Sequence, residues 1–164
     1  MGLDNIPNKY ACKTQGTAVM VELIDQATGK AILDENGQTY EQIDCDQTMA
    51  CGGCPWKDRL GNSNGRAYGI FGTPCWYRGK YGVRLLDAVG IHGGQMLYGT
   101  SYDKPVVTPH ACTLLADNID DHLGDGDETE RFFMDGEDVT DDLIYLRDWL
   151  MFVAEECDGS EAWY

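Results

Sequence analysis

Residues 45–84, CDQTMACGGCPWKDRLGNSNGRAYGIFGTPCWYRGKYGVR, decide how the rest of the chain is interpreted. They contain four of the seven cysteines, two of the four tryptophans and six of the twelve basic residues in a chain of 164 residues. Residues 52–99 also contain twelve of the twenty glycines. Because glycine loses more backbone entropy on folding than any other residue, this stretch needs a further source of order. We therefore expect a glycine-rich cysteine platform that is held together by a metal ion and presents arginine and aromatic side chains.

The cysteines of this platform have the spacing C-x5-C-x2-C-x20-C. Two cysteines separated by two glycines form a knuckle whose sulfur atoms can converge on one tetrahedral ion, and two further thiols complete its coordination. The spacing predicts a structural zinc, or with the same ligands an iron–sulfur cluster, held by Cys45, Cys51, Cys54 and Cys75. The usual second C-x2-C knuckle is missing, so alternative ligands are considered, namely His92, His110 and Cys112. A turn that carries free thiols is the simpler alternative.

Cys51-Gly-Gly-Cys54 also permits a different interpretation, a redox-active dithiol. Such a pair works when a helix N-terminus lowers the pKa of the first thiol, and Pro55 could begin such a helix. A thioredoxin-like fold, however, would begin with a β-α-β pattern, whereas this chain begins with strand-like segments. A CxxC oxidoreductase is therefore an alternative function. No other catalytic residues are identified, and the sequence favours a binding protein over an enzyme.

The formal net charge of −16 is unevenly distributed along the chain. Residues 1–56 carry −5, residues 57–84 carry +5 and residues 85–164 carry −16. A protein that binds duplex nucleic acid normally presents a broad basic face, which this chain lacks. The pattern favours a small anionic ligand at the basic stretch or, alternatively, a basic protein partner elsewhere. In the second case, residues 117–142 would form an acidic interaction module or mimic the charge of a nucleic acid.

The basic stretch interleaves cations with aromatic residues and glycines. Arginine offers a planar fork of donors for phosphate or carboxylate, and aromatic rings can stack on a base. The predicted ligand-binding residues, for a small anionic and nucleotide-like ligand, are Arg66, Trp76, Tyr77, Arg78, Lys80 and Arg84. The competing interpretation makes the aromatic residues part of the core and pairs the cations with the chain's own 28 acidic residues. The signatures of RNA-binding sheets and of phosphate-binding Gly-Lys loops are both absent.

The hydrophobic pattern predicts one α+β domain that spans residues 1–164. Residues 1–16 contain breakers and are expected to be irregular. An N-terminal antiparallel β-meander is predicted from apolar, β-branched segments at residues 17–24, 30–33 and 38–43. Two C-terminal helices are expected to pack on this sheet: one from Thr108-Pro109 to Gly124, the other from Thr140 to Asp158-Gly159.

The expected compartment is the cytoplasm, away from membranes. The chain has no run of about 18 apolar residues, and its first residues lack the basic and apolar regions of a secretory signal. In a reducing compartment thiols persist as free thiols, metal ligands or redox catalysts, and seven cysteines cannot all pair within one chain. This expectation favours metal binding over a disulfide framework.

Overall fold

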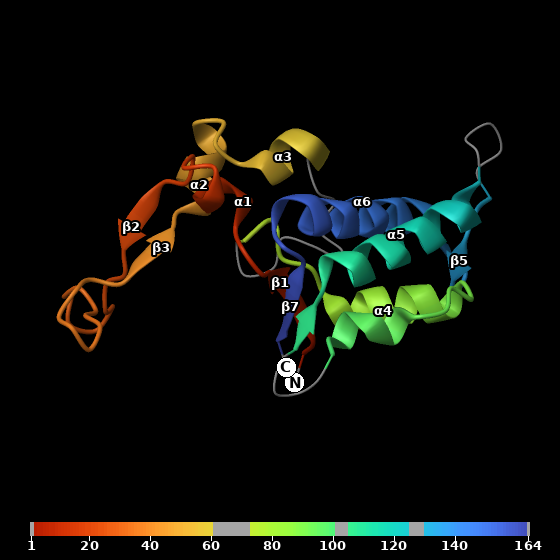
Figure 1. Cartoon of the computed structure of the whole chain (residues 1–164), viewed down its shortest axis with the longest axis horizontal. Coiled ribbons are helices and arrows are strands. Elements are labelled where there is room, and N and C mark those ends of the chain that lie inside the picture. Colours follow the sequence, from red (N-terminus) through yellow and green to blue (C-terminus); the bar gives the residue numbers. More distant parts are fainter. Residues whose placement is uncertain (1, 61–72, 101–104, 125–129, 164) are drawn as a thin grey trace.

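The computed structural model describes residues 2–60, 73–100, 105–124 and 130–163. In these ranges it combines six α-helices with three small antiparallel sheets, so the fold is α+β in the general sense that the sequence predicts. Figure 1 shows a body of packed helices with a short sheet at one end. None of the described helices has the length and apolar character needed to span a bilayer.

The two C-terminal helices begin and end close to the residues predicted. Helix α5 (Pro109–Leu123) begins after Thr108, whose hydroxyl accepts a hydrogen bond from the Ala111 N–H at 3.2 Å. Helix α6 (Thr140–Glu156) begins differently, because the Asp138 carboxylate accepts the hydrogen bond from the Thr140 N–H at 3.0 Å. The two helices pack against each other (Figure 1). Their fully buried side chains include Leu115, Ile119, Leu146, Trp149, Leu150 and Val153.

Helix α4 (Gly79–Ala88) and the 3₁₀ helix η2 (Gly94–Tyr98) complete the helical body. From the sequence alone, residues 83–89 predict one or two helical turns, and residues 95–98 are compatible with a strand. Helix α4 contributes Leu85 and Leu86 to the core, and η2 contributes Leu97; each is 0% exposed. The described residues of the predicted platform are therefore largely helical, with α2 (Cys45–Ala50) and α3 (Pro55–Leu60) preceding α4.

A small sheet joins the two ends of the described chain. Strand β7 (Ser160–Trp163) lies between β1 (Asp4–Pro7) and β4 (Val106–Val107), and both neighbours run antiparallel to it. Residues 1–16 were expected to be irregular, but they contain β1 and the short helix α1 (Ala11–Thr14). Residues 4–7 form a strand because they pair with β7, near the other end of the chain.

The segment predicted as a meander forms an arm, residues 18–44, that projects from the helical body (Figure 1). Strands β2 (Met20–Glu22) and β3 (Glu41–Ile43) pair in antiparallel register. The middle segment joins them through isolated bridges, Ile24 with Ala31 and Leu33 with Thr39. A second hairpin, β5 (Phe133–Met134) with β6 (Glu137–Asp138), leads into α6.

Candidate functional site

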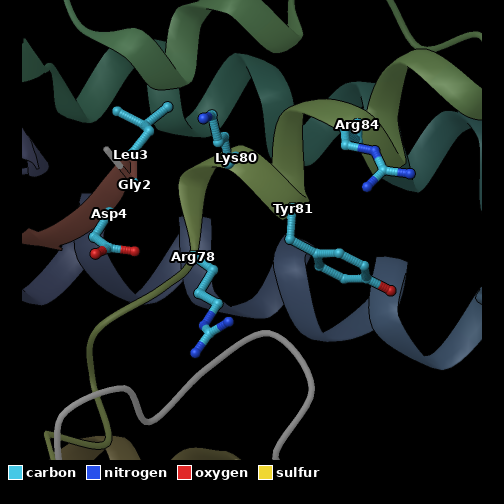
Figure 2. A pocket seen from close by; sticks show the side chains of 7 residues that line it. All are labelled: Gly2, Leu3, Asp4, Arg78, Lys80, Tyr81 and Arg84. Carbon is cyan, nitrogen blue, oxygen red and sulfur yellow. The ribbon is translucent and has the colours of Figure 1, made fainter. Parts of the chain in front are cut away.

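A basic pocket opens at the start of α4. Its volume is about 450 Å³, within the range of small-molecule sites. Figure 2 shows Lys80 and Arg84 on the first two turns of the helix and Arg78 just before it, beside residues at the beginning of the chain. The lining residues are Gly2, Leu3, Asp4, Arg78, Lys80, Tyr81 and Arg84.

Strand β1 fixes the start of α4 through backbone hydrogen bonds. Asn5 and Tyr77 exchange N–H···O bonds of 2.7 and 2.8 Å, and the Lys80 N–H donates to the Leu3 carbonyl oxygen at 3.2 Å. Asn5 is fully buried, and its side-chain amide donates to the Leu97 carbonyl oxygen at 3.0 Å. The backbone of the basic pocket is thus anchored in the core, while its charged side chains remain at the surface.

The pocket is positive although the chain is strongly negative. Arg78 and Lys80 are exposed, and the Arg84 side chain is 69% exposed with its guanidinium 3.7 Å from the Asp135 carboxylate. Asp4 contributes the negative charge among the lining residues. Arg78 and Lys80 leave the helix in different directions (Figure 2), so a ligand that touches both must draw at least one of them toward itself.

Tyr81 supplies the aromatic surface of this pocket. Its ring is half-buried, and its hydroxyl donates to the Asp142 carboxylate on α6 at 2.5 Å. This bond fixes the ring against the helical body. The rest of the ring lines the pocket.

The other predicted ligand residues lie elsewhere. Tyr77 is 0% exposed and packs against Tyr145 and Trp149, as the competing core interpretation expected. Trp76 is half-buried, its indole N–H donates to the Tyr10 hydroxyl at 2.9 Å, and its ring packs against Trp163. Arg66 lies outside the described residues. The structure therefore brings Arg78, Lys80 and Arg84 together and directs the two aromatic residues into packing.

The four predicted zinc ligands lie in three different places. Cys54 and Cys75 line a small apolar cavity of about 20 Å³ together with Cys12 and Cys157. Cys45 lines the neighbouring pocket, and Tyr10 belongs to both linings. Cys51 is exposed, and its thiol donates to the Thr48 carbonyl oxygen of its own helix at 3.4 Å. Cys12 lines the same cavity as Cys54 and Cys75. The spacing within residues 45–84 could not indicate this, because Cys12 lies outside that stretch.

The alternative ligands do not line either of these cavities. His92 and His110 are exposed, while Cys112 is fully buried and its thiol lies 3.9 Å from the Val107 carbonyl oxygen. Within the described ranges, no three side chains of His, Cys, Asp or Glu are already arranged as they would be around a bound metal ion.

Burial governs the acidity of the thiols. In each case where the thiol pKa is shifted it is raised, and desolvation is the largest cause; for Cys112 and Cys157 the pKa rises to about 12. The raised values belong to Cys12, Cys45, Cys75, Cys112 and Cys157.

A comparison of the chain with protein-family models, curated proteins and solved structures gave no match. The functional argument therefore depends on the two sites themselves. Gly2, Leu3 and Asp4 were missed in the basic pocket because the sequence shows no signal that places residue 3 beside residue 80.

Proposed function

We propose that this chain is a small binding protein whose basic pocket receives a small anionic ligand. The observation that carries the proposal is the meeting of Arg78, Lys80 and Arg84 around one cavity in a chain of net charge −16. Acidic residues outnumber basic ones by 28 to 12. A pocket lined by three basic residues and one acidic residue therefore differs from the average composition of the chain. Guanidinium and ammonium groups bind phosphate and carboxylate through charge-assisted hydrogen bonds.

The pocket also favours a ligand with an apolar or aromatic part. Tyr81 lines the pocket with the cations, and Gly2 has no side chain that would prevent close approach. A nucleotide combines these features, since its phosphates meet the cations and its base can lie on a tyrosine ring. The ligand class that we propose is a phosphorylated, nucleotide-like small molecule.

Thermal melting with inorganic phosphate, AMP, ATP and cyclic nucleotides tests this proposal. A ligand present at 100 times its dissociation constant adds about 2.7 kcal/mol to the free energy of unfolding. The double variant Arg78→Ala, Lys80→Ala should fold normally, because both side chains are exposed, and should lose the shift. Lys30→Ala, which removes one positive charge from the exposed arm, should keep it. If none of the phosphorylated compounds shifts the melting temperature, the proposal is wrong.

A second test uses a variant that is expected to bind the ligand more tightly, because a misfolded protein would lose affinity and not gain it. Asp4→Asn removes the negative charge from the pocket lining. At about 4 Å in water a unit charge is worth about 1 kcal/mol, so binding of a phosphate group should tighten by about fivefold. Glu35→Gln, a matched change at an exposed position in the arm, should leave the dissociation constant unchanged. Titration calorimetry measures both variants.

The exposed acidic side chains of α5 support a second candidate function, the binding of a basic protein partner. Asp117, Asp120 and Asp121 are all exposed, although Asp120 accepts a hydrogen bond from Arg147 at 2.9 Å. Attraction of this kind mainly increases the association rate and is weakened by salt. A pull-down whose partners survive high salt unchanged would count against this candidate.

A further inference from the structure

Four cysteines that are far apart in the sequence approach one another at the base of the arm. They are Cys12 on α1, Cys45 at the first position of α2, Cys54 just before α3, and Cys75 in the segment before α4. We refer to Cys12, Cys45, Cys54 and Cys75 as the thiol cluster. Three of them line one cavity, and the fourth lines the adjoining pocket, across the shared Tyr10.

Hydrogen bonds hold the segments that carry these cysteines together. The Thr17 hydroxyl donates to the Gly53 carbonyl oxygen at 2.7 Å, and this bond joins the end of α1 to the residue before Cys54. The Thr48 hydroxyl accepts from the Val19 N–H at 2.9 Å, so α2 is attached to the same place. A Cβ atom on Gly53 would lie 2.4 Å from the Thr17 carbonyl oxygen, which shows how closely the backbones approach.

The segment of Cys75 is fixed from two sides. The Thr73 side chain hydrogen-bonds the Cys45 thiol, and the Trp149 indole N–H of α6 donates to the Cys75 carbonyl oxygen at 2.9 Å. Hydrogen bonds therefore hold the backbone segments of the thiol cluster in fixed positions relative to one another.

We propose that the thiol cluster binds one zinc ion, with Cys12 as the fourth ligand in place of Cys51. Four cysteines are a usual ligand set for structural zinc, and the apolar cavity that three of them line has about the volume of a single water molecule or ion. In binding, four S–H bonds break, four Zn–S bonds form and four protons pass to solvent. No electron is transferred.

Binding requires the sulfur atoms to move inward. In the described part of the chain no three potential ligands yet have metal-binding geometry. All four cysteines lie on a four-residue helix, at a helix start or in connecting segments, rather than within a long helix. Rotation of these short elements, or a change of side-chain rotamer, is the movement that would bring the sulfurs to the Zn–S distance of about 2.3 Å.

The neighbouring cysteines are less suited to the ion. Cys51 is exposed, and its thiol is turned back toward Thr48. Cys157 lines the cavity too, but it is the C-cap of the long helix α6, which limits how far its sulfur can move toward an ion. Cys157 therefore serves as a packing residue beside the ion.

The ligand set implies what the ion does for the fold. Cys12 and Cys45 lie on either side of the arm, at the points where the chain leaves the body and returns to it. Cys54 and Cys75 belong to the body and lie next to α3 and α4. One ion would thus attach both ends of the arm to the helices, in a region where the described chain otherwise has only short elements. This role is independent of any ligand in the basic pocket.

The first experiment measures metal content by native mass spectrometry and elemental analysis of the chain purified without chelator. One zinc per chain is expected, and the cobalt-substituted protein should show the absorption bands of tetrahedral cobalt bound by four thiolates. Absence of both zinc and cobalt binding would overturn the proposal, as would an iron-containing, coloured protein.

The second experiment identifies the ligands. Cys51→Ser should keep the zinc and the four-thiolate cobalt spectrum, whereas Cys12→Ser should weaken zinc binding by at least 100-fold. Because Cys12→Ser can also disturb folding, alkylation of the wild-type chain is mapped by mass spectrometry before and after treatment with a chelator. Chelation should expose Cys12, Cys45, Cys54 and Cys75 together, and Cys51 should react in both states. Protection of Cys51 by zinc, with Cys12 reactive throughout, would show that the ligand set is wrong.

Discussion

Asp138 stabilises the start of α6 with a single carboxylate. It is hydrogen-bonded by the Thr140 side chain and accepts a bond from the Thr140 backbone N–H, and it pairs with Arg131; these contacts lower its pKa from 3.8 to about 2. A lowered pKa in the folded state means that the stabilisation is fully present above about pH 4 and is lost as the pH falls toward about 2.

We therefore predict that Asp138→Asn flattens the dependence of unfolding free energy on pH between about pH 4 and pH 2. Asparagine retains an oxygen acceptor for the Thr140 N–H but carries no titratable charge. Urea denaturation at several pH values measures the effect. Glu35→Gln, at an exposed site in the arm, is the control and should reproduce the wild-type slope. An unchanged slope in Asp138→Asn would mean that the interaction contributes nothing to stability.

Individual residues also show where sequence reasoning reaches its limit. The cations Arg78, Lys80 and Arg84 could be selected from their spacing along a basic stretch, and they do line one pocket. Tyr77 could not be separated from them, because an aromatic side chain has the same appearance in a sequence whether it packs in the core or binds a ligand. Local spacing selected Cys51, whose thiol is turned back toward Thr48 by the helix that precedes it, and gave no signal for Cys12.

At the scale of elements, the contact between β1 and α4 depends on a residue without a side chain. A Cβ atom at Gly79 would lie 2.2 Å from the Asn5 side-chain oxygen and 3.0 Å from Leu3. Asn5 cannot move away, because its backbone pairs with Tyr77 and its amide with Leu97. The first turn of α4 is therefore pressed directly against β1.

Two effects oppose each other in the variant Gly79→Ala. Helix propensity favours alanine by about 1 kcal/mol, whereas overpacking a close contact costs about 1–3 kcal/mol. Because Asn5 is held in place, we predict net destabilisation and weaker binding in the basic pocket. Gly94→Ala places its Cβ at ordinary contact distances of 3.4–3.5 Å and should have a smaller effect. Chemical denaturation of both variants measures the difference, and a stabilised Gly79→Ala would contradict this account.

The elements that the sequence predicted well are those whose pattern is local. Helices α5 and α6 have long apolar stripes and clear ends, and their bounds were predicted closely. Strands β1 and β7 are four residues each and pair across the whole chain, so no local pattern indicates them. Helix α4 begins earlier than predicted because Gly79 and Gly82, which weaken a helix in isolation, allow close packing here.

At the scale of the whole molecule, two electric fields act on an anionic ligand. The net charge of −16 repels it at long range, while the three cations of the basic pocket attract it at short range. The distance over which the net charge acts depends on salt, since the Debye length falls from about 30 Å at 0.01 M to about 8 Å at 0.15 M. As salt rises, the long-range repulsion is therefore screened at lower salt concentrations than the short-range attraction.

This difference predicts an unusual salt dependence for the proposed phosphorylated ligand. Its affinity should increase as salt rises from about 0.01 M to about 0.15 M, and it should decrease toward about 1 M, where the Debye length of about 3 Å reaches contacts within the pocket. Titration calorimetry over this range measures the curve, and replacing chloride with glutamate controls for competition by the salt anion. A basic partner on the acidic surface of α5 would instead weaken steadily from the lowest salt upward. A maximum at intermediate salt would thus favour the basic pocket as the functional site, and a steady decline for the anionic ligand would show that the field of the whole molecule does not reach it.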